Sequence, residues 1–235
     1  MARRSHSIRL EESDGAVTIL RETVALVPRM PSVVGVFGVV ALVGLLSSSL
    51  GSFASLLGGA VAVSIAYGKV GGRVGAANSI GVRLLLAVIG GIIAGFCIVL
   101  GTIFFVLPGI YLLVRLRLVV AAVVLEDRGP VEALGRSFDL TEGHTWTVFG
   151  VWLVPLLVGI ALGAGIVVST SGIPSPGTVD SAAFRSSVQV AGAVTTLVTG
   201  PVGAIADTLM YGLYGPDEVG GSRSGGTAAA TTADE

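Results

Sequence analysis

Residues 84–114 read LLLAVIGGIIAGFCIVLGTIFFVLPGIYLLV, and these 31 positions contain no charged side chain. A transmembrane helix needs about 20 apolar residues, because each residue rises about 1.5 Å and the hydrocarbon core is about 30 Å thick. The stretch is too long for one such helix. Leu107-Pro108-Gly109 interrupts it with residues that end one helix and allow another to begin. We therefore predict two spans here, over about 82–105 and 109–125.

Three further stretches lack acidic and basic side chains and are long enough to contain spans: residues 33–68, 143–179 and 186–206. The serine-rich residues 47–52 divide the first stretch, and two prolines near residue 175 end the second. The sequence therefore predicts an all-α, polytopic transmembrane helix bundle of six spans. The four predicted spans other than the two at 82–105 and 109–125 cover about 32–47, 51–67, 144–168 and 186–211.

The composition also indicates a membrane protein. Of the 235 residues, 52% are hydrophobic and 12% are charged, whereas about a quarter of a soluble domain is charged. Disorder of the chain as a whole is excluded, because it requires low hydrophobicity and high charge. A formal net charge of −1 offers no basic surface for nucleic acid. The expected partners are membrane lipids, with another membrane protein or a second copy of the chain left open.

No motif for catalysis, cofactor binding or metal binding is found in the sequence. The single cysteine, Cys97, lies in an apolar run, and the two histidines, His6 and His144, are distant in sequence. There is no Walker A loop, G-x-S-x-G turn or H-E-x-x-H helix. We therefore expect a protein that is not an enzyme, with no cofactor and no metal.

Basic residues are distributed asymmetrically among the predicted connections. Arginines precede the first span, the connection 68–83 carries Lys69, Arg73 and Arg83, and the connection 126–143 carries Arg128 and Arg136. The turns at 47–52 and at Pro108 carry no basic residue, and the opposite-side connection near residue 175 carries Arg185 alone. Basic loops remain in the cytoplasm. We therefore expect a multi-pass plasma-membrane protein with both termini cytoplasmic.

Three regions follow from these spans. Residues 1–31 form a cytoplasmic N-terminal segment, 32–211 the six-span membrane domain, and 212–235 a disordered cytoplasmic tail rich in small residues. Acidic residues before the first span argue against a cleaved signal peptide. The N-terminal segment includes an amphipathic helix over 14–28, which lies in the membrane interface or packs on the bundle. Its apolar stripe consists of Val17, Leu20, Val24 and Val27.

A second amphipathic helix is predicted between the fourth and fifth spans. Pro130 suits its first turn, and Gly143 suits the position after its last residue. Glu132 and Arg136 are four residues apart and are expected to pair. The apolar face consists of Val131, Leu134 and Phe138. This region supplies a candidate cytoplasmic interface motif: Glu126, Pro130, Arg136, Ser137 and Glu142.

Two glycine pairs have the spacing that allows helices to approach closely in lipid. They are Gly91 with Gly95, and Gly159 with Gly163. Packing within one bundle is favoured over contact between two copies of the chain.

A candidate intramembrane polar cluster consists of Arg115, Arg117 and Asp207. Each arginine costs about 2.5–3.5 kcal/mol at mid-helix, and the aliphatic residues of 109–125 return only about 5 kcal/mol in total. This span therefore needs partners. On a continuous helix the two arginines differ by about 200° and cannot face the same groove. We predict that one pairs with Asp207, the acidic residue of the sixth span, while the other reaches toward lipid head groups.

Two blocks of the sequence resemble a known membrane domain: residues 108–116 (PGIYLLVRL) and 126–143 (EDRGPVEALGRSFDLTEG). Together they are similar to the six-helix membrane domain attached to some glycerophosphoryl diester phosphodiesterases, and closer still to its stand-alone haloarchaeal relatives. The resemblance covers about 15–215 and is specific over 108–146. The resemblance implies a six-helix membrane fold with the same topology, located in a prokaryotic plasma membrane. The phosphodiesterase chemistry of the fused proteins belongs to a separate soluble barrel, so no catalytic residue is carried over.

Three functions are compatible with the sequence. The leading hypothesis is a non-enzymatic accessory or interaction component of the plasma membrane. A small transporter or channel subunit is the second, because two arginines lie inside a span. The third is a lipid-head-group enzyme at the cytoplasmic face that uses Glu142, His144 or Asp207.

Overall fold

A computed structural model of the chain describes residues 15–70, 79–104, 106–173, 175, 179 and 181–215. Over these residues the secondary structure is helical. Of the predicted disordered tail 212–235, residues 212–214 instead belong to a helix, and those beyond 215 lie outside the described residues, as do the basic residues before 15 and at 73. The helices are α1 (Ala16–Leu26), the short η1 (Val27–Arg29), α2 (Pro31–Leu46), α3 (Ser48–Val70), α4 (Ile80–Phe104), α5 (Val106–Arg115), α6 (Val119–Glu126), α7 (Pro130–Thr141), α8 (Thr145–Ser171) and α9 (Ala182–Tyr214).

The predicted all-α helix bundle is confirmed, with five or six segments that are long and apolar enough to span a membrane. Five segments are long and apolar enough to cross a membrane: Leu50–Val70, Ile80–Thr102, Pro108–Glu126, Thr145–Ser171 and Ala182–Tyr214. The predicted first span, α2, has only 16 residues. It counts as a sixth span if it is joined to Ala16–Arg29, from which it is bent by 85°.

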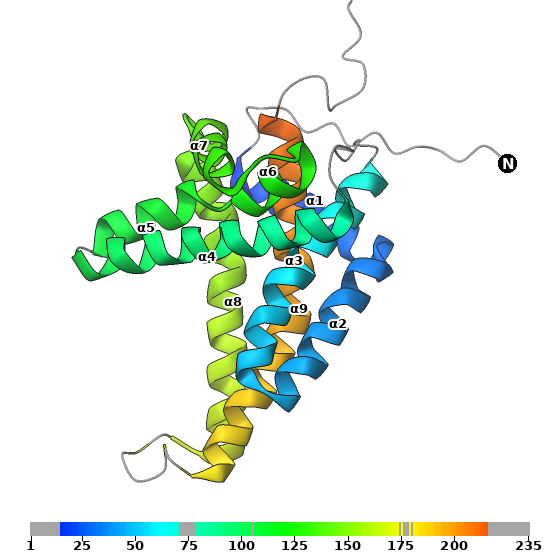
Figure 1. Ribbon diagram of the computed structural model, residues 1–235. Coiled ribbons are helices and arrows are strands. Elements are labelled where there is room, and N and C mark those ends of the chain that lie inside the picture. Colours follow the sequence, from blue (N-terminus) through cyan, green and yellow to red (C-terminus); the bar gives the residue numbers. More distant parts are fainter. Residues whose placement is uncertain are drawn as a thin grey trace, which may run out of the picture.

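Helix α9 organises the bundle. It packs against α8, α2 and α3, and these four long helices run side by side (Figure 1). The hairpin of α4 and α5 lies across the long axes of these four helices (Figure 1). Helix α4 packs on α3, α6 and α7. We expected the turn at Pro108 to lie at the same end as the α2–α3 and α8–α9 connections. The hairpin instead extends sideways, so that expectation was wrong; hydropathy specifies the length of these helices but not their direction.

Glycines bring α4 and α5 into close contact. A Cβ atom at Gly109 would lie 2.7 Å from the Cα of Thr102, and a Cβ at Gly101 would lie 3.3 Å from the Cα of Gly109. Contacts this short with backbone atoms cannot be relieved by rotating a side chain. The absence of a side chain at position 109 is therefore what allows the two helices to approach this closely.

We expect Gly109→Ala to lower the free energy of unfolding by about 1–3 kcal/mol, because the added methyl group forces the α4 and α5 backbones apart. Chemical unfolding of the detergent-purified protein measures the change. The matched control is Gly95→Ala, since a Cβ at Gly95 meets no atom within 4 Å. Equal stability of the two variants would contradict the close packing of this hairpin.

The fourth span is broken, whereas the sequence predicted a continuous helix over 109–125. Helix α5 ends at Arg115 and α6 begins at Val119, with a turn between them. The buried hydroxyl of Ser137 on α7 bridges this break. It accepts a hydrogen bond from the backbone N–H of Leu118 (3.2 Å) and donates one to the carbonyl oxygen of Arg115 (2.6 Å). Ser137 thus replaces backbone partners that a continuous helix would have supplied.

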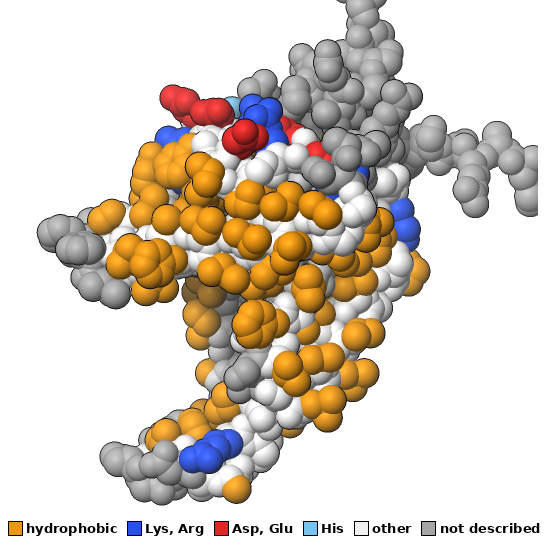
Figure 2. Space-filling model, viewed as in Figure 1, with side chains coloured by type: hydrophobic (Ala, Val, Ile, Leu, Met, Phe, Trp, Pro, Cys, Tyr) orange, Lys and Arg blue, Asp and Glu red, His pale blue; other side chains and the backbone are white. Residues whose placement is uncertain are grey.

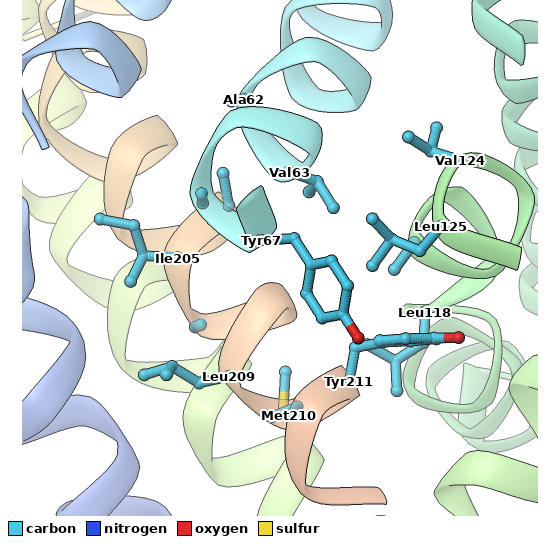
Figure 3. Close-up of a cluster of buried hydrophobic side chains, with 14 of the residues drawn as sticks. Ala62, Val63, Tyr67, Leu118, Val124, Leu125, Ile205, Leu209, Met210 and Tyr211 are labelled. Atoms are coloured by element: carbon cyan, nitrogen blue, oxygen red, sulfur yellow. The ribbon is translucent and has the colours of Figure 1, made fainter. Parts of the chain in front are cut away.

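One part of the hydrophobic core lies where α3, α6 and α9 meet (Figure 3), and the same core cluster extends to residues of α1, α2, α4, α7 and α8. Helix α6 is buried almost entirely, from Val119 to Leu125. Tyr67 of α3 meets Tyr211 of α9 edge to face, with ring centroids 5.7 Å apart. Other members of this cluster are Ala62, Val63, Leu118, Val124, Ile205, Leu209 and Met210 (Figure 3).

The surface away from this core is apolar. Large hydrophobic side chains are exposed along α4 and α8, among them Leu85, Phe96, Leu157 and Ile160. Charged side chains gather at the end of the molecule that carries α6 and α7, hereafter the charged end (Figure 2). Exposed apolar helix faces of this extent are those of a protein surrounded by lipid.

Helix α1 packs on α8 and α9 rather than on lipid alone. Its buried residues are Ile19, Thr23 and Leu26, whereas Val17 and Val24 of the predicted apolar stripe are exposed. Leu20 and Val27 of that stripe pack against the core, so the packing face overlaps the predicted stripe in part. Neighbouring helices bury a face that includes a threonine, whose hydroxyl donates to the carbonyl oxygen of Ile19 (2.7 Å).

Helix α7 shows a similar difference. Pro130 lies in its first turn and Gly143 adopts a positive φ of 76° just after its end, as predicted. Val131, from the predicted apolar face, is exposed. The buried face consists of Ala133, Ser137, Leu140 and Thr141. Small and hydroxyl-bearing residues are buried here because α7 packs closely against the broken span.

The second glycine pair packs inside the bundle, as favoured. A Cβ at Gly159 would lie 3.0 Å from the Cγ2 of Thr195, and one at Gly163 would lie 3.6 Å from its Oγ1. Gly91 faces Leu56 of α3, and a Cβ at Gly95 would meet no atom within 4 Å.

Candidate functional site

A cavity of about 580 Å³ lies within the bundle. Helices α3, α6, α8 and α9 form its walls, together with Phe37 of α2. Helices α3 and α8 each pack on α9 but share at most marginal contact with one another. The cavity is therefore a groove between α3 and α8 with α9 as its floor, and we refer to it as the α3–α8 cavity.

The α3–α8 cavity is amphipathic along its length. One end contains the side chains of Arg117 and Asp207. Toward the other end the walls are Leu56, Leu156, Gly159 and Ile160. Along α9, Asp207 and Thr195 are 12 residues apart, which corresponds to about 18 Å. The cavity therefore combines one charged end with an elongated, mostly apolar body.

Arg117 and Asp207 form an ion pair across the cavity. The Nε atom of Arg117 lies 3.0 Å from Oδ1 of Asp207 and donates a hydrogen bond to it. The Arg117 side chain is 32% exposed and the Asp207 side chain 16%. Arg117 can reach α9 because it lies in the turn between α5 and α6, and because Gly203 has no side chain to block it.

Arg115 lies elsewhere and does not join this pair. Its Nε donates to the hydroxyl of Tyr111 (2.9 Å), and its Nη1 donates to the carbonyl oxygen of Phe138 on α7 (2.9 Å). Its guanidinium also lies over the Tyr111 and Phe138 rings. The predicted contact with Asp207 is thus present for Arg117 and absent for Arg115, and the two arginines point in different directions, as expected for residues two positions apart.

The residues of the predicted interface motif contribute to a polar network at the charged end. The carboxylate of Glu126 accepts hydrogen bonds from Arg128, Arg136 and the hydroxyl of Tyr211; the distance from Arg136 Nε is 2.9 Å. Hydrogen bonding to Glu126 raises the pKa of Arg128. Arg136 thus pairs with the partly buried Glu126 and not, as the sequence had predicted, with Glu132.

Other members of the motif serve as structural elements of the same region. Ser137 bridges the break in the fourth span, and Pro130 begins α7. The ring of His144 stacks on Tyr214 at 4.3 Å, and its Nδ1 lies 3.1 Å from the carbonyl oxygen of Glu142. Neither Glu142 nor His144 lines the α3–α8 cavity, so these two residues and Asp207 do not form one site.

Asp127 and Arg83 form an ion pair that the sequence did not predict. The Nε atom of Arg83 lies 2.5 Å from Oδ1 of Asp127, and both side chains are buried. Asp127 has a φ of 56°, which Asp tolerates better than most residues, and it ends α6. This pair joins the start of α4 to the end of the fourth span. The sequence carried no signal for the pairing itself, because Arg83 and Asp127 are 44 residues apart.

The cavity itself was also missing from the sequence-based prediction. Its walls come from segments separated by more than 100 residues, from Phe37 to Met210. In the sequence, the apolar residues of each wall have the same helical spacing as residues that face lipid or the core, so the spacing does not distinguish them. Only the charged residues inside two spans indicated its position.

Comparison with known proteins identifies a family without indicating an activity. No curated protein and no solved structure matches the chain. A family model described as a domain of unknown function, DUF7847, matches residues 52–212. This segment includes both residues of the ion pair and all of the cavity walls except Phe37. Because the match covers more than half of the chain, the protein belongs to the DUF7847 family.

Proposed function

We propose that this protein is a non-enzymatic accessory component of the plasma membrane that binds an amphipathic, membrane-resident molecule in the α3–α8 cavity. The observation that carries this proposal is the shape and polarity of the cavity. It has one charged end and an elongated apolar body between two helices that scarcely contact one another. A concave, mostly apolar site with a few convergent polar groups is typical of small-molecule binding.

The polar groups of the cavity support binding over catalysis. Asp207 is held by Arg117. The hydroxyl of Thr199 donates to the carbonyl oxygen of Thr195 (2.9 Å), and that of Thr195 donates to the carbonyl oxygen of Gly159 (3.5 Å). These groups stabilise helices and helix packing, and none is paired with a general base as a nucleophile would be.

The proposal includes an orientation. The charged end, with α6, α7 and the end of α9, would face the cytoplasm, as the positive-inside rule suggests for Arg128 and Arg136. Both termini would then be cytoplasmic. The resemblance to the membrane domain of glycerophosphoryl diester phosphodiesterases supports a prokaryotic plasma membrane as the location.

Tryptophan fluorescence tests the binding proposal directly. The chain has two tryptophans, and Trp152 lines the cavity. In a Trp146→Phe background, we expect phospholipids with brominated acyl chains to quench Trp152 saturably when they are titrated into the detergent-purified protein. The probe is an equal mixture of brominated phosphatidylglycerol and phosphatidylcholine.

A plugging variant and a matched control complete this test. Gly59 lines the cavity, and a Cβ there meets no atom within 4 Å, so Gly59→Leu fills the cavity without displacing the backbone. We expect Gly59→Leu to remove the saturable quenching. Gly165→Leu adds the same side chain at an exposed, open position of α8 and should leave it intact. Non-saturable quenching that is equal in all variants would refute binding in the cavity.

A transporter is the second candidate, favoured by one specific feature. The fourth span is discontinuous next to an intramembrane charged pair, as in many transporters. If this function is correct, Gly59→Leu would abolish solute or ion flux into proteoliposomes that contain the protein. Proteoliposomes without flux for any tested solute, combined with saturable lipid binding, would favour the accessory role.

A further inference from the structure

We infer that Arg117 binds the phosphate group of a membrane phospholipid whose acyl chain occupies the α3–α8 cavity. This inference rests on the proposed function and adds the class of ligand and the residue that recognises it.

The first step of the argument is the unused hydrogen-bonding capacity of Arg117. A guanidinium has five N–H donors and no acceptor. Asp207 engages the Nε atom alone. Among the described residues, no partner is found for the two Nη groups, which carry the other four donors. The ligand should therefore present several acceptor oxygens and no donor, as a phosphodiester does.

The second step is the accessibility of these donors. Arg117 lines the cavity, and about one third of its side chain is exposed. The Nη2 atom lies above Gly203, where even a Cβ would approach it to 3.1 Å. A glycine at this position lets the guanidinium lie close to the α9 backbone with no side chain between them, while part of the Arg117 side chain stays exposed to the cavity. The free Nη groups are therefore accessible to a molecule in the cavity.

The third step is the position of Arg117 relative to the membrane. Its partner Asp207 lies seven residues before Tyr214, the last residue of α9, which corresponds to about 10 Å from the charged end. The apolar body of the cavity extends from there in the opposite direction, toward Leu156 and Ile160. A phospholipid that enters between α3 and α8 would place its phosphate near the charged end and its acyl chain in the apolar body.

The fourth step concerns charge. Arginine and phosphate form short, charge-assisted hydrogen bonds, often in bidentate geometry. The two Nη groups can provide such a pair while Nε continues to donate to Asp207. The Asp207 carboxylate repels a phosphate nearby, so it should weaken phospholipid binding. Neutralising Asp207 is therefore expected to strengthen binding, an effect that a purely structural ion pair would not produce.

The test compares two brominated probes that share acyl chains, phosphatidylglycerol and diacylglycerol, by saturable quenching of Trp152 in the Trp146→Phe background. We expect phosphatidylglycerol to bind at least about tenfold more tightly, because charge-assisted hydrogen bonds to phosphate are replaced by weaker ones to a hydroxyl group. Arg117→Gln should reduce this preference to less than about threefold while saturable diacylglycerol binding persists. Asp207→Asn should increase the affinity for phosphatidylglycerol, and brominated phosphatidylcholine shows whether net lipid charge contributes.

The outcomes separate this inference from the function on which it rests. Retained saturable binding of diacylglycerol by Arg117→Gln shows that the variant is folded and that the cavity is intact. Equal affinities for the two probes, unchanged in Arg117→Gln, would overturn phosphate recognition and leave cavity binding standing. Unchanged or weaker phosphatidylglycerol binding by Asp207→Asn would also count against the inference. Absence of saturable binding for every probe would overturn both proposals.

Discussion

Replacing Arg117 with leucine is expected to lower the free energy of unfolding by about 3 kcal/mol, because it leaves the carboxylate of Asp207 without its partner inside the bundle. Neither side chain is fully buried, but the pair lies between helices of the bundle, where a carboxylate left without its partner is costly even if the intact pair contributes little to stability. Unfolding of the detergent-purified protein, followed by circular dichroism in increasing denaturant, measures the change.

A double-mutant cycle identifies the pair itself. We expect Arg117→Leu combined with Asp207→Asn to cost at least about 1 kcal/mol less than the sum of the single changes, because each change removes the same interaction. Arg115→Leu is the matched control, since Arg115 contacts Tyr111 and Phe138 and not Asp207. Its effect should add to that of Asp207→Asn. Additive costs for Arg117→Leu as well would show that the pair is not formed.

Ser137→Ala is the second change with a large expected effect, a loss of about 2–4 kcal/mol. The serine hydroxyl satisfies the N–H of Leu118 and the carbonyl oxygen of Arg115 at the break in the fourth span. Each buried backbone group left without a partner costs about 1–3 kcal/mol. Water cannot readily replace the hydroxyl, because Ser137 is fully buried.

The control for Ser137→Ala is Ser186→Ala on α9. Ser186 is exposed, and its hydroxyl donates to the carbonyl oxygen of Ala183 (2.9 Å) within its own helix. We expect that variant to lose less than about 0.5 kcal/mol. Denaturant unfolding of both variants in the same detergent gives the comparison. A loss at Ser137 no larger than at Ser186 would show that this hydroxyl does not stabilise the break.

Residues that act through chain-local chemistry could be recognised in the sequence. Pro130 begins α7 and Gly143 takes a positive φ after it, because a missing N–H and a missing Cβ have the same consequences in any fold. The contact of an arginine with Asp207 was also predictable, because unpaired charge inside a span is costly and few partners are available.

Residues whose role depends on a distant neighbour could not be assigned in this way. Arg136 was expected to pair with Glu132, four residues away, but it donates to Glu126 on another helix. On α1 the buried face includes Thr23 and leaves Val17 exposed, opposite to the order of their hydrophobicity. For Arg136 the tertiary contact outweighs a local pair preference of only about 0.2–0.5 kcal/mol, and for α1 the neighbouring helices decide which face is buried.

The sequence by itself determined that this is a helical membrane protein and the approximate extent of its spans. It also determined that Arg115 or Arg117 needs a partner, because a charged side chain is costly in hydrocarbon whatever the fold. Only the tertiary structure decided that the fourth span is broken at residues 116–118, that Arg117 is the partner of Asp207, and that a cavity lies beside them. The physical reason is that the break depends on the Ser137 hydroxyl, and the cavity on how α3 and α8 pack on α9. Both features depend on contacts between segments that are far apart in the sequence, whereas hydropathy and periodicity describe each segment separately.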